Sequence, residues 1–343
     1  MKKYTAYAID RTMELLAIDS PTGYTTNVVK RLCHIISDLG FTPQVTNKGN
    51  VFVEVGGKGN ALCAAAHVDT LGAMVAEVKS NGRLRLTPLG GLNANNAEAE
   101  NVRVYTRDGN CIEGTFQLCN ASIHVNTEYN DVKRTFDSCE VVLDAAATTT
   151  AADVAKLGIA VGDIVAFEPR SRLTAEGYIK SRFLDDKLSA GILLGLLKYV
   201  HDVKPTFKRK LYLYFTVHEE VGHGCAYLPA DDVKDMLSVD MGCVGNGLTC
   251  TEREVSVCVK DSHGPYNYDF VTYLVNAAKS TASNYALDVY PRYGSDADVA
   301  LSSGYDVRHG LIGAGVYASH GYERSHKAGV LNTLKTLKGY LFV

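Results

Sequence analysis

The stretch LYLYFTVHEEVGHGC (residues 211–225) places two adjacent glutamates directly after a continuous apolar run. A short apolar run of this kind is typical of a strand buried on both faces, as in a largely parallel sheet. Glu219 and Glu220 would then lie at the end of a buried strand, where two like charges are costly unless something neutralises them. The stretch therefore predicts a buried strand whose carboxyl end carries a functional site.

Other segments also place carboxylate or imidazole side chains just beyond a predicted strand or at the start of a predicted helix. Together with the opening stretch, they supply His67 and Asp69, Asp185 and Asp186, His218 with the two glutamates, Asp240, and His320 and His326. In an open α/β sheet, ligands bind beyond the carboxyl ends of the strands. We therefore expect these side chains to converge on one edge of the sheet.

The alternation of patterns along the chain indicates the fold class. Helical and strand patterns alternate through about the first sixty residues and resume near residue 178, whereas the middle third shows short strands separated by Gly, Asn and Asp. We predict an α/β fold with a mixed, largely parallel sheet flanked by helices, of the phosphorylase/hydrolase-like type. Residues 1–70 and 178–343 would form the α/β domain, and residues 71–177 a small inserted β-rich domain. The RDGN step at 107–110 predicts a hairpin turn within the insertion.

Length and composition exclude several classes of protein. The chain has 343 residues, 46% of them hydrophobic, and a formal net charge of −3, so no strong positive field favours nucleic acid or acidic membranes. No apolar run approaches the roughly 20 residues that span a bilayer, and the N-terminus lacks the apolar core of a signal peptide. The nine cysteines form no CxxC pair, which favours reduced thiols in a cytoplasmic protein.

Each of these polar residues has an ordinary explanation when it is taken alone. Asp185 could cap a helix, the adjacent glutamates could be solvated, and Asp240 could belong to a turn. Five segments that all present such residues at one sheet edge indicate a metal centre instead. Cations neutralise carboxylates that would otherwise repel one another.

The number of candidate ligands indicates two metal ions. Two histidines and three carboxylates can hold a pair of divalent ions about 3.5–4 Å apart, with one carboxylate bridging them. Imidazole combined with carboxylate favours zinc, cobalt or manganese over calcium. One glutamate of the adjacent pair would remain to act as a base, and Asp69 would orient the imidazole of His67.

Five motifs occur in order along the chain: AHVDTLGAMV (66–75), FLDDKLSAG (183–191), TVHEEVGHGCA (216–226), SVDMG (238–242) and GYERSH (321–326). In sequence and order they resemble the motifs of the TET-type dinuclear-metal aminopeptidases, a group that includes glutamyl, leucyl and deblocking aminopeptidases. The resemblance covers nearly the whole chain and includes a β-rich insertion between the first and second motifs. It implies that residues 1–70 and 178–343 form the catalytic domain, and that residues 71–177 form a small β-barrel-like domain for oligomerisation. It implies an enzyme that hydrolyses N-terminal residues from peptides with a metal-activated water.

The resemblance also implies which residues hold the metal. His67 and Asp240 would hold one divalent ion. Glu220 and His326 would hold the other, and Asp185 would bridge the two. The ions would be Zn²⁺ or Co²⁺, two in each subunit.

Two further roles and one open choice follow from the same resemblance. Glu219 would be the general base, and Asp69 would orient His67. The last motif departs from the family's Arg-Tyr-x-His pattern, because here the order is Tyr-Glu-Arg-Ser-His. We choose His326 as the last ligand, and His320 remains the alternative.

The resemblance implies peptide substrates and self-assembly into a homo-oligomer such as a dodecamer, with no nucleic-acid or membrane partner. Two other functions stay open. A related dinuclear metallohydrolase, such as a carboxypeptidase or deacylase, uses the same metal chemistry, so only substrate profiling separates it from an aminopeptidase. A non-catalytic, metal-stabilised assembly protein is less favoured, because structural zinc sites are typically closed and cysteine-rich. The pattern does not give the preferred N-terminal residue.

Overall fold

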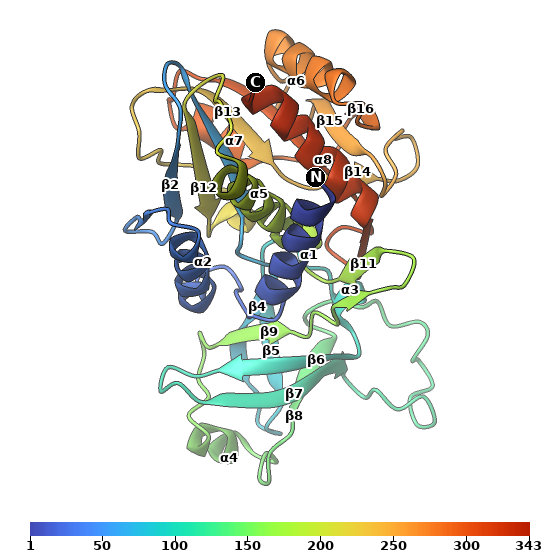
Figure 1. Cartoon of the computed structure of the whole chain (residues 1–343). Helices are drawn as coiled ribbons and strands as arrows, with labels where there is room; N and C mark the ends of the chain where they lie inside the picture. Colours follow the sequence, from blue (N-terminus) through green and yellow to red (C-terminus); the bar gives the residue numbers. More distant parts are fainter. The chain divides into compact units, whose positions relative to one another are not determined.

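The computed structural model describes residues 1–343, and they form two compact units. The larger unit comprises Met1–Asp69 and Arg170–Val343, and the smaller unit comprises Thr70–Pro169. The smaller unit is therefore continuous in sequence and inserted into the larger one, as the colours of Figure 1 let the reader follow.

The return to the larger unit lies at residue 170 rather than at the expected 178. The reason is a short hairpin of strands β10 (Arg172–Leu173) and β11 (Tyr178–Ser181). Strand β11 pairs with β18 (Glu323–His326), so the hairpin extends the sheet of the larger unit. From sequence alone, such short strands look like a continuation of the β-rich insertion.

The larger unit is built on a 12-stranded mixed sheet whose central strands β12, β3, β13 and β17 are parallel. Its strands, apart from the hairpin and β18, are β1 (Pro43–Val45), β2 (Val51–Gly56), β3 (Ala61–His67), β12 (Leu211–Thr216), β13 (Val233–Val239), β14 (Gly242–Val244), β15 (Val255–Lys260), β16 (Tyr285–Val289) and β17 (Arg308–Tyr317). β3 and β12 are buried along their whole length, as continuous apolar runs predict.

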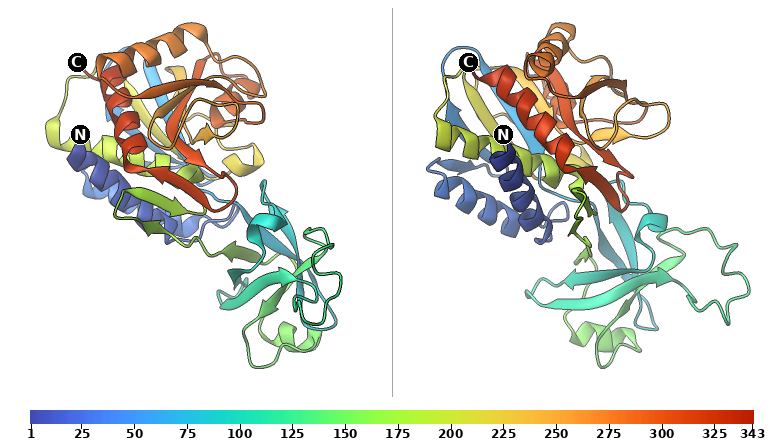
Figure 2. Two further views of the ribbon diagram at one scale, coloured as in Figure 1. Left: turned by 90° about the vertical axis from the view of Figure 1, so that its right-hand side faces the viewer. Right: turned by 45° about the vertical axis from the view of Figure 1, so that its right-hand side comes forward.

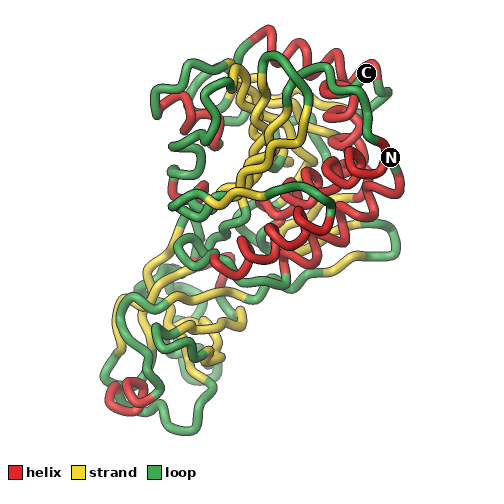
Figure 3. The backbone as a smooth tube through the Cα atoms, turned by 60° about the vertical axis from the view of Figure 1, so that its left-hand side comes forward, coloured by secondary structure: helices red, strands yellow, loops and turns green.

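Helices border this sheet, as the red segments of Figure 3 show. They are α1 (Lys2–Leu16), α2 (Thr26–Asp38), α5 (Leu184–Val203), α6 (Tyr268–Ser280), α7 (Asp296–Ser302) and α8 (Lys327–Leu341). In both views of Figure 2 the red C-terminal helix α8 lies beside the dark blue α1, and the two helices are in contact.

Helix α5 is held unusually close to α1 by a glycine. A Cβ atom at Gly191 would lie 2.1 Å from Thr12 Oγ1 and 2.6 Å from the carbonyl oxygen of Ala8. Any larger side chain would push the two helices apart. The close contact holds α5 against α1, and the first turn of α5 carries Asp185 and Asp186.

The smaller unit is a closed antiparallel barrel with strand order β4-β5-β8-β7-β6-β9. Its elements are β4 (Gly72–Val78), β5 (Leu84–Leu89), α3 (Ala94–Ala97), β6 (Glu100–Tyr105), β7 (Cys111–Leu118), β8 (Cys139–Leu143), α4 (Ala151–Lys156) and β9 (Ile164–Phe167). Phe116 and Phe167 meet in its core with ring centroids 5.7 Å apart. Strands β6 and β7 pair as a hairpin across RDGN, where Gly109 has a φ of 85°. The predicted fold class, a largely parallel α/β sheet with an added barrel, is confirmed.

Two other sequence expectations concern membranes and thiols. No helix has both the length and the apolar character that a membrane crossing requires. All nine cysteines are free. Burial raises the pKa of the Cys225 thiol well above its usual value, which makes this cysteine unreactive. The cytoplasmic location stays a prediction.

Candidate metal centre

The site lies where the carboxyl ends of three adjacent parallel strands meet. β3 ends at His67 and β12 at Thr216, and these two residues are partners in the sheet register. β13, on the other side of β3, ends at Val239, directly before Asp240. The glutamate pair follows β12 in the short 3-10 helix η1 (Glu219–Val221). The sheet therefore brings together side chains from the segments that the sequence indicates.

A cavity of about 320 Å³ opens at this edge of the sheet. Its wall includes Asp185, Glu219, Glu220, Asp240, Arg292 and His320. Four of these six side chains are carboxylates, so the cavity suits a cation. Asp185 stands at the start of α5 and is joined to Asp186 by a cis peptide bond.

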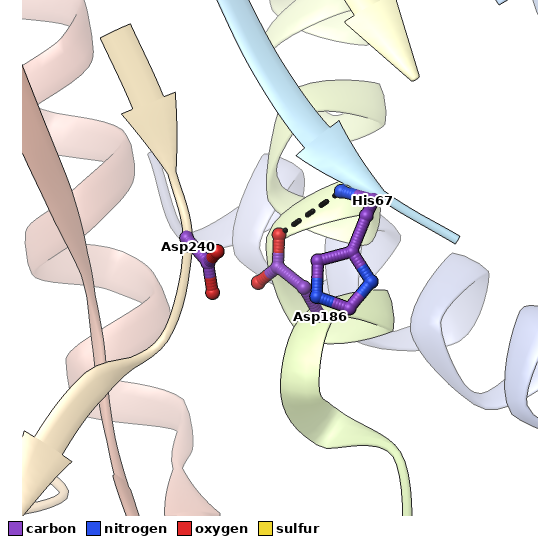
Figure 4. A group of neighbouring side chains, drawn as sticks. All are labelled: His67, Asp186 and Asp240. Atoms are coloured by element: carbon purple, nitrogen blue, oxygen red, sulfur yellow. Dashed lines mark hydrogen bonds between the residues drawn. The ribbon is translucent and has the colours of Figure 1, made fainter. Parts of the chain in front are cut away.

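Two overlapping groups of possible metal ligands occur in the site. The ligand atoms of His67, Asp186 and Asp240 all lie within 4.8 Å of one another, and Figure 4 shows these side chains around a common space. Those of His67, Asp185 and Glu220 also lie within 4.8 Å of one another. Because His67 belongs to both groups, the two ion positions that they define would be neighbours.

The imidazole of His67 has one nitrogen fixed and the other directed at the carboxylates. Nδ1 lies 2.9 Å from the backbone carbonyl oxygen of Asp69, which can only accept, so Nδ1 carries the hydrogen. Nε2 lies 3.0 Å from Asp185 Oδ1. Burial lowers the pKa of His67, but the hydrogen bond to Asp185 and the nearby carboxylates raise it well above its usual value. A cation at Nε2 would replace that proton.

The carboxylate of Asp69 holds the glutamate pair rather than the imidazole. Oδ1 accepts a hydrogen bond from the N–H of Glu219 at 3.2 Å. Oδ2 accepts from the N–H of Glu220 at 3.4 Å and from the Thr22 hydroxyl at 2.7 Å. Asp69 thus orients His67 through its carbonyl group, and its carboxylate anchors the turn that carries the two glutamates.

Several carboxylates of the site are buried with too few partners. Glu220 Oε1 and Asp186 Oδ1 are buried and accept no hydrogen bond, which is rare in folded proteins. Burial, and then the charge of Asp185, raises the pKa of Glu220 well above its usual value. The same two causes raise the pKa of Asp240 to about 7. A cation would satisfy these oxygens and remove the repulsion between the carboxylates.

The structure places His320, and not His326, beside these carboxylates. Nε2 of His320 lies 3.4 Å from Asp185 Oδ2 and 3.8 Å from Glu220 Oε2. His326 instead caps α8: its Nδ1 accepts from the N–H of Ala328 at 3.0 Å, and its Nε2 donates to a backbone carbonyl at 2.9 Å. Both ring nitrogens of His326 are therefore in use, which corrects the choice of this residue as the last ligand.

Known proteins match this chain along most of its length. The profile of the M42 glutamyl aminopeptidase family matches residues 49–336. The chain belongs to this family. The relative named "Putative aminopeptidase YhfE" from Bacillus subtilis (strain 168) is 38% identical over 341 residues, which is 97% of this chain and 98% of the relative. The glutamyl aminopeptidase of Lactococcus lactis subsp. cremoris (strain MG1363) is 29% identical over 217 residues, or 62% of this chain and 60% of that relative.

A solved structure shares the fold of this M42 peptidase. The TET1 peptidase of Pyrococcus horikoshii has a TM-score of 0.85 at 18% identity, and the match covers 98% of this chain and 99% of that one. Identity this low shows the fold alone. Family membership makes the protein a peptide hydrolase of a metal-dependent aminopeptidase family, in agreement with the two ligand groups.

Glu323 is a site residue of this M42 peptidase that the sequence did not single out. Its buried carboxylate accepts one hydrogen bond from the N–H of Asp185 and one from the N–H of His320, both at 3.0 Å. It therefore fixes the backbone positions of two possible metal ligands. The only sequence signal was an acidic residue inside the GYERSH motif.

Asp296, at the start of α7, also fixes the backbone of the site. Its carboxylate accepts from the Thr216 hydroxyl at 2.5 Å and from the N–H of Cys225 at 2.8 Å. These bonds fix the two ends of the segment that carries the glutamate pair, at Thr216 and at Cys225. His218 and His223 lie in the same segment but belong to neither ligand group.

Proposed function

We propose that this M42 peptidase removes single residues from the N-terminus of peptides with the help of two divalent metal ions. The observation that carries the proposal is the pair of overlapping ligand groups that share His67. The buried, unbonded Oε1 of Glu220 supports it, because a cation held by this carboxylate would satisfy that oxygen.

Five residues would hold the two ions. His67 and Asp240 would bind one ion, and Glu220 and His320 the other. Asp185 would bridge them, because its Oδ1 faces His67 and its Oδ2 faces His320. Imidazole with carboxylate favours zinc or cobalt over calcium. When bound, such ions lower the pKa of a water molecule and stabilise negative charge on a carbonyl oxygen.

Glu219 is the residue that we propose as the general base. It lines the cavity, belongs to neither ligand group, and has its backbone N–H anchored by Asp69. Burial, only partly opposed by the charge of His67, raises the pKa of Glu219 well above its usual value. A raised pKa suits a carboxylate that must accept a proton near neutral pH. Glu219 would take the proton of the attacking water and deliver it to the leaving amine.

The size and charge of the cavity favour an exopeptidase that acts at the amino end. A volume of about 320 Å³ lies at the low end of the roughly 300–1,000 Å³ of ligand pockets, so it suits one terminal residue. The carboxylates of the wall would attract the free α-ammonium group. Arg292 is the feature that would instead favour a carboxypeptidase, since it could bind a terminal carboxylate.

We also propose that the protein is a homo-oligomer that assembles through the smaller unit. The TET1 peptidase of P. horikoshii can assemble into a tetrahedron or a large octahedral shell, and a dodecamer is the form that we expect here. Light scattering on the purified chain tests this, and a monomer at micromolar concentration would contradict it.

The mechanism is tested with Glu219→Gln, loaded with zinc or cobalt in parallel with wild type. The variant should keep two ions per chain and lose at least about a hundredfold in kcat, because it keeps the shape of the site but cannot accept a proton. Elemental analysis and turnover of an aminoacyl p-nitroanilide give the two readouts. Glu54→Gln, on an exposed glutamate of β2, is the control. Near-normal activity of Glu219→Gln would remove this residue from the role.

Blocked peptides separate the possible activities. An aminopeptidase cleaves a tripeptide that is amidated at its C-terminus and leaves intact a tripeptide that is N-acetylated and has a free C-terminal carboxylate. Cleavage of the acetylated peptide alone would favour a carboxypeptidase or a deacylase. A chelator should abolish turnover, and added zinc or cobalt should restore it.

A further inference from the structure

A second group of ligand-type side chains lies outside the candidate metal centre. Asp261 directly follows β15, and Asp298 lies in the first turn of α7. Both carboxylates are buried. Their ligand atoms and that of His263 all lie within 4.8 Å of one another. None of these three residues has a role in the proposed peptidase reaction.

Asp261 is fixed in place by its own loop. Its Oδ1 accepts from the N–H of His263 at 2.8 Å, and its Oδ2 accepts from the Tyr266 hydroxyl at 2.7 Å. The first of these bonds turns the loop back so that the imidazole of His263 stands beside Asp298. The carboxylate is therefore preorganised next to a second carboxylate and an imidazole.

Asp298 has an oxygen to spare. It is 8% exposed, and its Oδ2 accepts from the N–H of Ser295 at 2.9 Å as part of a helix capping box. Its Oδ1 accepts no hydrogen bond, and the Nε2 of His309 lies 3.8 Å from it. On the other side, the Nδ1 of His263 lies 3.8 Å from Oδ2. These separations are too long for hydrogen bonds, so both imidazole nitrogens face a buried carboxylate without bonding to it.

No lysine or arginine neutralises this pair of carboxylates. The basic groups within 4.0 Å of Asp298 are the two imidazoles. Lys260 is next to Asp261 in sequence, but its Nζ donates to the backbone carbonyl of Asp261 at 2.7 Å. The local charge balance therefore calls for an added cation.

The loop that carries His263 is joined to one wall of the candidate metal centre. A Cβ atom at Gly294 would lie 2.6 Å from His263 Cε1, so the imidazole packs directly on that backbone. Ser262 and Tyr293 exchange two hydrogen bonds, at 3.2 Å and 2.9 Å. Because Tyr293 and Gly294 line the cavity, an ion held by His263 would also stiffen the cavity wall.

We propose that Asp261, His263 and Asp298 bind a third divalent metal ion, separate from the pair at the sheet edge. Two carboxylates and one imidazole leave one position for water, an arrangement that suits zinc or manganese. Ligands of a tetrahedral ion with bonds of about 2.0–2.1 Å lie roughly 3.4 Å apart. The 3.8 Å between His263 Nδ1 and Asp298 Oδ2 needs only a small closure to match. The His263 side chain is 62% exposed, which gives the ion a route in.

The test counts zinc ions per chain in the full-length protein. Wild type, His263→Ala and Asp298→Asn are stripped with chelator, reloaded with zinc, passed through a desalting column and measured by elemental analysis. Each variant should hold one ion per chain fewer than wild type. His263 is exposed, so its replacement tests the site even if Asp298→Asn disturbs the cap of α7 and fails to fold.

The matched control is His34→Ala. His34 is a similarly exposed imidazole, 65% exposed and 3.6 Å from the single carboxylate of Asp38. It lacks a second carboxylate, so its loss should leave the ion count unchanged. With cobalt in place of zinc, the wild-type spectrum minus that of His263→Ala should show the visible absorption of one tetrahedral ion.

One more variant separates this proposal from that of the peptidase site. Asp185→Asn should lose ions at the sheet edge and keep the one that His263→Ala removes. Equal ion counts in wild type and His263→Ala would overturn the third site, whatever the state of the peptidase activity.

Discussion

Strand β13 carries one aspartate near its start and another just beyond its end, and the surroundings of the two are opposite. Asp235 is buried and ion-paired with Arg209 and with Arg308, whose Nε lies 2.7 Å from Oδ1. Asp240 is equally buried but lies among other carboxylates, with no arginine or lysine in ion-pair distance. Burial, and then the charge of Asp185, raises the pKa of Asp240 to about 7.

The contrast separates a structural carboxylate from a functional one. A buried carboxylate with its own cations is satisfied by the fold alone. A buried carboxylate without them depends on protons or ions from the solvent. Burial and charge type are the same in the two cases, so the missing cation is what distinguishes the site. Arg292 lines the cavity but forms no ion pair with these carboxylates.

The largest expected effect comes from Asp185→Asn. The asparagine keeps the shape but removes the charge of the proposed bridging ligand, so both ions should be lost. We expect kcat/KM to fall by about a thousandfold or more, equivalent to about 4 kcal/mol of transition-state stabilisation. Elemental analysis and kinetics measure the two effects. Normal ion content in this variant would exclude Asp185 as the bridge.

The opposite variant is Asp235→Asn, which should affect stability and leave the chemistry intact. It leaves Arg209 and Arg308 without their shared partner, and we expect a loss of about 3 kcal/mol in the free energy of unfolding. Urea denaturation measures this. Asp232→Asn, which breaks a more exposed pair with Lys210, should cost less than about 1 kcal/mol. Loss of metal in Asp235→Asn would contradict the assignment of a purely structural role to Asp235.

The two histidines of the last motif should separate in the same way. His320→Ala should weaken binding of one ion and lower kcat/KM by about a hundredfold. His326→Ala removes a helix cap and should cost about 1 kcal/mol of stability while it keeps both ions. Zinc titration of the two variants measures their ion binding, and thermal unfolding measures their stability. The reverse outcome would return the ligand role to His326.

The smallest effect concerns the pH dependence of the metal-free protein. The folded-state pKa of Asp240 is about 7, against about 3.9 in an unfolded chain. Its favourable contribution is therefore fully present below the unfolded value and lost as the pH rises through about 7. The pKa of Glu219 and Glu220 is raised as well, so they act in the same direction.

Thermal unfolding of chelator-treated protein between about pH 5 and pH 8 tests this expectation. The Tm should fall by several degrees as the pH rises, whereas bound ions should remove most of the fall. Asp240→Asn without metal should show a smaller fall than the metal-free wild type. A metal-free wild type that gains stability over this range would show that other groups dominate.

The sequence predicts the parts of the molecule that depend on buried strands. Continuous apolar runs mark β3 and β12, and parallel pairing brings the residues after them together. This is why the convergence of His67 with the glutamate pair, and the insertion of a barrel, could be predicted. The boundary at residue 170 could not, since the short strands β10 and β11 resemble barrel strands until their pairing with β18 is known.

Other details depend on contacts that a linear pattern does not contain. His320 and His326 lie six residues apart and are equally plausible ligands by type, but one lies in the turn after β17 and the other ends β18. Asp69 was expected to act through its carboxylate, yet its carbonyl faces His67. The approach of Asp261 to Asp298 depends on how a loop packs against the first turn of α7.

The clamp formed by Glu323 matters for anyone who wishes to transplant this site into another scaffold. Glu323 lies 138 residues from Asp185 along the chain, yet one carboxylate group spans the backbones of Asp185 and His320. The distance between the backbones of Asp185 and His320 is thus set by the carboxylate group of Glu323, which is rigid, rather than by the loops between them. A graft that copied the metal ligands and omitted Glu323 would carry the right side chains, but nothing would hold the backbones of Asp185 and His320 at the correct distance.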